Sequence, residues 1–269
     1  MSRYVVKVDL VDTDEWARRG SSFGAVAAAY AEHRPDYPAD AVRWCVAPTG
    51  REVAGLRVLD LGAGTGKLTA VLADLGADVT AVEPDEAMLA ELRRQLPSVR
   101  ALPGPAEAIP LADGSVDAVL CAQSMHWFDM SRALPEIARV LAPGGALGAL
   151  WNSDDDRVEW VAGLRDVADG AGSPVRSQRE RDATAFGAEQ FGNELFTPTD
   201  RAEFENPQPR TIDSLIDDLR THSAVLIMEP AERERVLGRV RGYLASRPET
   251  GSGAFALPMV TSALRSVRR

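Results

Sequence analysis

Residues 57–67 read Arg-Val-Leu-Asp-Leu-Gly-Ala-Gly-Thr-Gly-Lys and carry the strongest structural signal in the chain. The first five residues form a short apolar run that is typical of a buried strand. A glycine-rich turn follows, and then a helical pattern of apolar residues from Leu68 to Leu75 that Gly76 ends. Glycines at a strand-to-helix turn let a ligand approach the backbone, and the first turn of the helix presents unpaired N–H groups. The stretch therefore predicts a strand–turn–helix unit with a ligand at the turn.

Strand and helix patterns alternate on both sides of this unit. We expect helices at 23–30, 39–47, 85–96 and 131–141, and strands at 78–83, 116–122 and 146–151. Strands that alternate with helices in this way predict an α/β fold in which a doubly wound, mostly parallel sheet is covered by helices on both faces.

The pattern changes after Asn152. Residues 153–210 are polar and weakly periodic, and they precede two amphipathic helices, at 212–227 and 231–246, and a final strand at 255–264. We assign 153–250 to helical insertions that cap the site and bind the substrate, and 251–269 to the last strand and tail. Residues 23–152 then form the ligand-binding core, and 1–22 a disordered N-terminal extension.

The composition excludes several classes of protein. Thirty Lys and Arg residues against forty Asp and Glu residues give a formal charge of −10 without a basic block, which argues against a nucleic-acid partner. No stretch approaches the roughly 18 apolar residues of a membrane helix. Cys45 and Cys121 form neither a disulfide framework nor a zinc pattern. We expect a cytoplasmic monomer or homodimer with no membrane partner and no metal.

Two acidic residues accompany the glycine turn. Asp60 lies on the strand two residues before Gly62, where a carboxylate could face an ammonium group, and Glu83 ends the next strand, where it could hold two ribose hydroxyls. The dinucleotide motif G-x-G-x-x-G needs glycine where this chain has Lys67. Because an acidic residue at 83 also fits a dinucleotide site, an NAD-type Rossmann oxidoreductase stays open as an alternative.

Five motifs in order resemble those of the class I S-adenosylmethionine (SAM)-dependent methyltransferases, and they occupy 58–66, 82–84, 106–111, 113–119 and 140–145. Tyr30-x-x-x-Arg34-Pro35-x-Tyr37-Pro38 and Gln123-x-x-His126-Trp127-Phe128 resemble the type 11 group, which includes trans-aconitate methyltransferase-like enzymes. The resemblance implies a seven-stranded sheet and SAM as the cofactor. It also implies methylation of a small molecule, at oxygen or carbon, by in-line SN2 displacement.

The resemblance assigns residues to each part of the cofactor. The methionine part would contact Asp60, Gly62, Ala63 and Gly64, and the ribose would contact Glu83 and Pro84. The adenine would contact Ala106 and Glu107, and Ala122 and Gln123 would line the sulfonium side. Tyr30 and Arg34 would belong to an N-terminal arm over the cofactor. The chain departs from many relatives at Pro105, where they carry an acid.

The residues that would act on the acceptor follow the fourth and fifth strands. His126 is the candidate general base, which is needed only if the acceptor must lose a proton, and packing explains this histidine equally well. Trp127, Trp151 and Asn152 would line the acceptor pocket, although the aromatic residues could instead hold loops to the sheet. A module that binds SAM without turnover is a further alternative.

Overall fold

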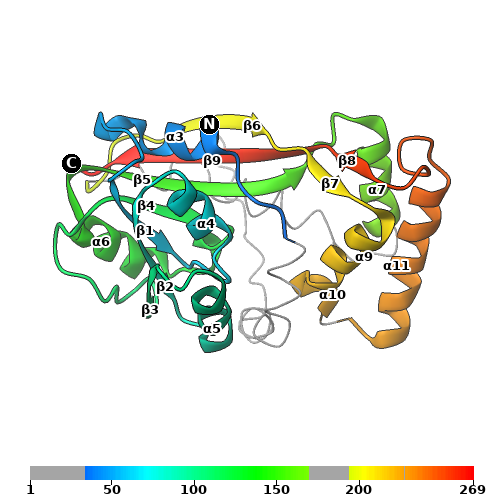
Figure 1. Ribbon diagram of the computed structural model, residues 1–269, viewed down its shortest axis with the longest axis horizontal. Coiled ribbons are helices and arrows are strands. Elements are labelled where there is room, and N and C mark those ends of the chain that lie inside the picture. The colour runs from blue at the N-terminus through cyan, green and yellow to red at the C-terminus, as the bar shows by residue number, and fades with distance from the viewer. Residues whose placement is uncertain (1–33, 170–193, 227) are drawn as a thin grey trace, which may run out of the picture.

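The computed structural model describes residues 34–169, 194–226 and 228–269. The expected extension at 1–22, the expected helix at 23–30 and the candidate residue Tyr30 lie outside these residues. The model shows a seven-stranded sheet at one end of the molecule and a group of helices at the other (Figure 1).

The sheet has the strand order β3-β2-β1-β4-β5-β9-β6. Its first five strands are parallel, whereas β9 runs antiparallel to both of its neighbours, β5 and β6. In chain order the strands are β1 (Arg57–Leu61), β2 (Asp78–Glu83), β3 (Arg100–Pro103), β4 (Val116–Ala122), β5 (Leu141–Asp154), β6 (Asp200–Glu205) and β9 (Met259–Val267). This arrangement confirms the doubly wound, mostly parallel seven-stranded α/β sheet.

Alternate residues of the central strands point to opposite faces of the sheet, and each face has its own apolar core. Val58 and Leu120 pack with α3 (Ala39–Val46) and α4 (Lys67–Asp74). Leu59 and Val119 pack on the other face with α6 (Met130–Val140). The remaining core helix is α5 (Glu86–Gln95). Its N-cap is Asp85, whose carboxylate accepts hydrogen bonds from the backbone N–H groups of the first turn. Helices thus cover both faces of the sheet, as the alternation predicts.

Strands β5 and β9 extend beyond the sheet to a second group of elements, which we call the helical unit (Figure 1). It contains α7 (Glu159–Asp169), α9 (Ile212–Arg220), α10 (Ser223–Leu226), α11 (Pro230–Ala245) and a ribbon of β7 (Gln208–Arg210) with β8 (Phe255–Leu257). The helices bury a third apolar core, which includes Trp160, Leu219 and Val240. The helical unit therefore has a core of its own and is held to the sheet by two continuous strands.

Several elements differ from the sequence prediction. The assignment of all of 153–250 to insertions is wrong at β6, which forms the edge of the main sheet. This edge strand is mostly polar, with only Ala202 and Phe204 half-buried between exposed residues, so its apolar pattern is weak. Neither β3 nor α7 was predicted. The helix expected at 212–227 is divided into α9 and α10, and the strand expected at 255–264 is divided at Pro258 into β8 and β9.

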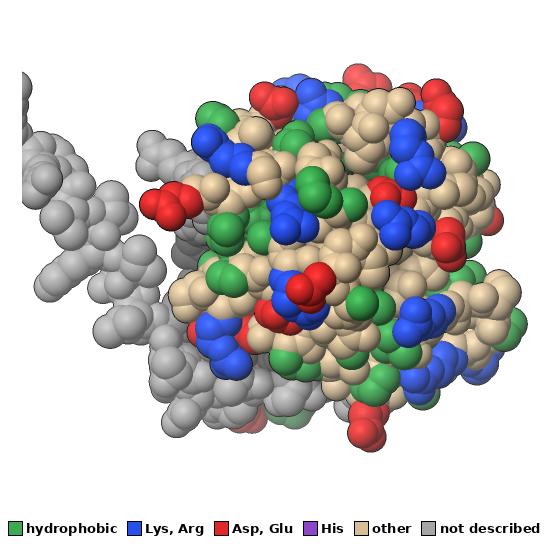
Figure 2. Space-filling model, turned by 90° about the vertical axis from the view of Figure 1, so that its left-hand side faces the viewer, with side chains coloured by type: hydrophobic (Ala, Val, Ile, Leu, Met, Phe, Trp, Pro, Cys, Tyr) green, Lys and Arg blue, Asp and Glu red, His purple; other side chains and the backbone are tan. Residues whose placement is uncertain are grey.

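The face that Figure 2 displays carries side chains of mixed character. Basic and acidic side chains are interspersed there with apolar ones, and neither sign of charge forms a continuous patch (Figure 2). Among the described residues, no helix combines the length and the apolar character that crossing a bilayer requires.

Candidate functional site

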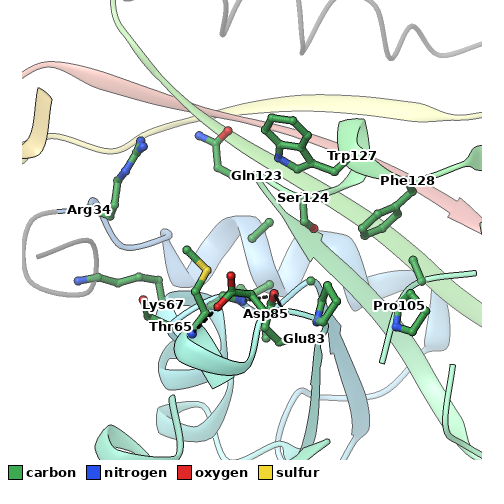
Figure 3. Close-up of a pocket in the computed structure, with 18 of the residues that line it drawn as sticks. Arg34, Thr65, Lys67, Glu83, Asp85, Pro105, Gln123, Ser124, Trp127 and Phe128 are labelled. Carbon is green, nitrogen blue, oxygen red and sulfur yellow. Dashed lines mark hydrogen bonds between the residues drawn. The ribbon is translucent and has the colours of Figure 1, made fainter. Parts of the chain in front are cut away.

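A cavity of about 390 Å³ lies at the carboxyl ends of β1, β2 and β4 (Figure 3). From β1 the strand order runs to β2 and β3 on one side and to β4 and β5 on the other, so the order reverses at β1. Ligands of open α/β sheets bind at such a reversal, which is called the switch point. Twelve of the predicted site residues line the cavity: Arg34, Gly62, Ala63, Gly64, Glu83, Pro84, Ala106, Glu107, Ala122, Gln123, Trp127 and Asn152.

The glycine turn needs its glycines for two different reasons. Gly62 has a φ of +71°, and a Cβ built there would lie 2.6 Å from the Cβ of Ser124, so the end of β4 leaves no room for a side chain. Gly64 also has a positive φ, +57°, but the nearest atom to its built Cβ is the Met88 sulfur at 3.8 Å. Gly62 therefore packs the turn against the sheet, and Gly64 leaves open space toward the cavity.

Glu83 ties this turn to the end of β2. Its Oε2 accepts a hydrogen bond from the N–H of Gly64, and its Oε1 accepts one from the N–H of Asp85, both at 2.8 Å (Figure 3). The side chain is buried, and burial raises the pKa of its carboxyl although the two backbone hydrogen bonds oppose the shift. Each carboxylate oxygen has a further lone pair. Glu83 is thus fixed in direction and can still accept hydrogen bonds from a ligand.

Asp60 is fully buried behind the turn, on the face of β1 that α4 covers, and does not itself line the cavity. Its Oδ2 accepts a 2.6 Å hydrogen bond from Thr69, whereas its Oδ1 has no hydrogen-bond partner among the described residues. Burial, with a smaller contribution from the charge of Glu83, raises the pKa of Asp60 to about 7. A buried carboxylate oxygen without a donor indicates a site for a cationic or hydrogen-bond-donating ligand.

The opposite side of the cavity is built by the end of β4. Gln123 has a φ of +53°, which is uncommon for a residue other than glycine, and its Nε2 donates to the carbonyl of Asn152 at 2.9 Å. Trp127 ends the short helix η3 (Met125–Trp127), and Phe128 follows it. In Figure 3, Gln123 and Trp127 lie across the pocket from Glu83. Strained backbone of this kind is common at functional sites.

Three predicted site residues lie in surroundings that do not match the roles predicted for them. His126 is partly buried against Trp127, with 4.9 Å between the ring centroids, and burial lowers its pKa to about 4. It does not line the cavity, so the geometry gives no support to a general base at this position. Trp151 is buried in the apolar core on the α6 face of the sheet. Glu107 does line the cavity, but its Oε1 already accepts a 2.7 Å hydrogen bond from the N–H of Asp129.

Sequence reasoning missed other lining residues, among them Thr65, Lys67, Asp85 and Ser124. Asp85 had a usable signal, since an aspartate directly before an amphipathic pattern is a typical helix N-cap. Thr65 and Lys67 belong to the stretch 57–67, in which cofactor contacts are predicted only for Asp60 and residues 62–64.

Comparisons with known proteins identify the same core. A family model described as a methyltransferase domain matches residues 59–149. The chain is 44% identical, over 91% of its length and 95% of the relative, to an uncharacterized methyltransferase of Mycobacterium tuberculosis. It is 34% identical, over 80% of its length and 82% of the relative, to an uncharacterized methyltransferase-like protein of Schizosaccharomyces pombe.

Two solved structures extend the similarity to the fold. One is a protein of Anaeromyxobacter dehalogenans proposed to be a type II methyltransferase. The match has 27% sequence identity and a TM-score of 0.65, and it covers 87% of this chain and 97% of that chain. The other is a proposed methyltransferase from an antibiotic biosynthesis pathway of Anabaena variabilis, with 21% identity, 84% and 95% coverage and a TM-score of 0.57. The second, at this identity, supports the fold alone.

Proposed function

This chain belongs to the SAM-dependent methyltransferases, and on that premise we propose that it methylates a small molecule at oxygen or carbon. The observation that carries the proposal is the cavity at the switch point, where the open glycine turn meets Glu83. Behind this turn lies the buried Asp60, whose Oδ1 has no hydrogen-bond partner among the described residues. An NAD-type oxidoreductase fits less well, because Lys67 replaces the third glycine of the dinucleotide motif.

The residues at this site fit the parts of SAM. Glu83 would accept hydrogen bonds from the ribose hydroxyls, and Ala106 and Glu107 would contact the adenine. The turn from Gly62 to Gly64 would accommodate the methionine part, whose positive charge suits the buried carboxylate of Asp60. When bound, SAM supplies a methyl group on a positively charged sulfur, which is a good leaving group.

The chain's own contribution is then to align the acceptor and exclude water. Orientation of two reactants in a site is worth about 7 to 11 kcal/mol, so a methyltransferase needs little further chemistry. Gln123 and Trp127 lie across the cavity from Glu83, and Asn152 is a further lining residue (Figure 3). Gln123 would face the sulfonium side of the cofactor, and Trp127 and Asn152 would contact the acceptor. We propose that the helical unit caps this side and that, together with residues 153–158, it forms the acceptor-binding part of the chain.

The acceptor atom is proposed to be nucleophilic before it binds. In the described part of the lining there is no imidazole, and the carboxylates of Glu83, Asp85 and Glu107 belong to the side assigned to the cofactor. An acceptor that is already ionised near neutral pH, such as a carboxylate or a stabilised carbanion, needs no proton acceptor from the chain. A neutral alcohol would need one.

Two experiments test the proposed function. Isothermal titration calorimetry with SAM and with S-adenosylhomocysteine should show binding in the micromolar range, and a folded sample that gives no heat with either would refute it. A screen of small carboxylic acids and carbon acids, with detection of released S-adenosylhomocysteine, should then find an acceptor. Tight SAM binding with no turnover for any acceptor class would favour a binding module instead.

A further inference from the structure

Residues 34–37 form a short segment, which we call the strap, that connects the helical unit with the cavity. The strap precedes α3 and runs between the sheet and the helical unit (Figure 1). Arg34, Pro35 and Tyr37 line the cavity, whereas Asp36 does not. The Arg34 guanidinium donates a 3.4 Å hydrogen bond to the carbonyl of Thr221, at the end of α9. Whatever fixes the strap therefore fixes one wall of the pocket.

Two buried asparagines hold the strap by one backbone carbonyl. The oxygen of Asp36 accepts hydrogen bonds from Nδ2 of Asn152, at 3.1 Å, and from Nδ2 of Asn206, at 2.8 Å. Asn152 is on β5, and Asn206 connects β6 to β7; their exposed fractions are 1% and 8%. A carbonyl that accepts two side-chain amides, both buried, is a strong anchor because each unmet donor would remain desolvated.

The asparagines are themselves fixed in orientation. The Nδ2 of Asn206 also lies 3.1 Å from Oδ1 of Asn152, which accepts a second hydrogen bond from Thr261 at 2.5 Å. The Oδ1 of Asn206 accepts from Nε2 of Gln208 at 2.9 Å. Rotating either amide would therefore place like groups against each other. The network keeps the donors of Asn152 and Asn206 directed at the strap.

The side chain of Asp36 holds the strap from the other direction. Its Oδ1 lies 3.2 Å from Nζ of Lys67, the first residue of α4, directly after the glycine turn. This ion pair is partly exposed, so its contribution is small beside that of the buried amides. Asp36 thus joins the strap both to the sheet end and to the turn.

We propose that Asn206 is a positioning residue for cofactor binding, which it supports by holding the strap against the pocket. The proposal rests on the proposed function, because the ligand concerned is SAM. Asn206 does not line the cavity, so it acts through the strap and not by contact. Loss of its amide leaves the Asp36 carbonyl with one donor and leaves Asn152 Oδ1 with one donor fewer. The bound cofactor should then dissociate faster.

The test measures S-adenosylhomocysteine binding to the full chain carrying Asn206→Ala. We expect a roughly tenfold higher Kd by calorimetry, mostly through a faster dissociation rate in stopped-flow tryptophan fluorescence. The matched control is Thr250→Val, which removes another buried side-chain-to-backbone hydrogen bond, to Leu244 in the helical unit. It should lower the melting temperature but keep the wild-type Kd. An unchanged Kd in Asn206→Ala, or an equal loss in Thr250→Val, would overturn the proposal.

A double-mutant cycle separates the strap from a general loss of stability. Arg34→Ala removes a strap side chain from the pocket wall, so Asn206→Ala should weaken binding much less in that background than in the wild type. Fully additive losses would contradict action through the strap. If Asn206→Ala does not fold, Gln208→Ala provides a second test, because it removes the Nε2 donor that orients the Asn206 amide and lies at a half-exposed position. It should raise the Kd about threefold, and an unchanged Kd would count against the proposal. Absence of binding by the wild type would refute the proposed function instead.

Discussion

The pH dependence of cofactor binding should report the ionisation of Asp60. In the free protein, burial raises the pKa of this carboxyl from 3.8 to about 7, and its Oδ1 has no hydrogen-bond partner among the described residues. An ammonium group of the ligand's amino-acid part beside this carboxyl favours the ionised form, so binding below pH 7 must release a proton. The affinity for S-adenosylhomocysteine should therefore fall up to tenfold for each pH unit below about 7 and be constant above it.

The same shift sets the stability of the free protein. The folded pKa lies above the unfolded value, so between about pH 4 and pH 7 the unfolded chain binds fewer protons than the folded chain. Stability must therefore decrease as the pH rises through this window and level off above it. A shift from 3.8 to about 7 corresponds to about 4 kcal/mol at most. Asp60→Asn keeps an oxygen for Thr69 and removes the titration, so its stability should lack this decrease.

The assay is calorimetry with S-adenosylhomocysteine from pH 5.5 to 8.5, in two buffers of different ionisation enthalpy, which counts the protons released. Asp60→Asn is the control. It should bind S-adenosylhomocysteine more weakly than the wild type, with a flatter pH profile. In urea denaturation at pH 8, it should unfold at a higher urea concentration than the wild type. The pKa of Glu83 is also raised, and the dependence that persists in Asp60→Asn belongs to that residue. Wild-type affinity independent of pH, or full affinity in Asp60→Asn, would refute the reasoning.

Three further predictions concern the turn and its neighbours. Gly62→Ala should lower the free energy of unfolding, measured by urea denaturation, by about 2 to 4 kcal/mol, because its Cβ would lie 2.6 Å from the Cβ of Ser124 at a positive φ. Gly64→Ala, where no atom is that close, should lower it by only about 1 kcal/mol. A larger loss for Gly64→Ala than for Gly62→Ala would contradict this account. Glu83→Gln should raise the Kd for S-adenosylhomocysteine at least tenfold in calorimetry, since it loses a charged hydrogen-bond acceptor; an unchanged Kd would remove Glu83 from the ribose site. His126→Gln should keep methyl transfer, measured as released S-adenosylhomocysteine, within about fivefold of wild type, and a hundredfold loss would restore the histidine as a base.

The side of the cavity that contains the glycine turn could be predicted from the sequence because local rules determine it. A buried strand, a glycine turn and a helix are contiguous in residues 57–75, and the structure places Gly62, Gly64 and Glu83 together as that pattern requires. The strand at 116–122 was likewise predicted with its observed bounds. In each case a short apolar run is buried in the sheet, so the run and the turn signals beside it identify the strand.

The rest depends on contacts between distant residues. Strand β6 is polar because it is an edge strand, and only its pairing with β9 identifies it. Asn206 lies far along the chain from Asp36, and nothing local marks an asparagine as the donor to a distant carbonyl. His126 follows the strand end at which ligands bind, yet its ring packs beside Trp127 and does not line the cavity. The local sequence does not determine which way this side chain points.

The central claim is that the cavity beside the glycine turn binds SAM. Calorimetry on the wild-type chain and on Gly64→Arg tests it most directly, because arginine at this position would fill the space that is open toward Met88. We predict one SAM bound per chain with a micromolar Kd in the wild type and no detectable binding in a folded Gly64→Arg. A folded wild type that binds neither SAM nor S-adenosylhomocysteine, or a Gly64→Arg variant that binds SAM with wild-type affinity, would contradict the claim.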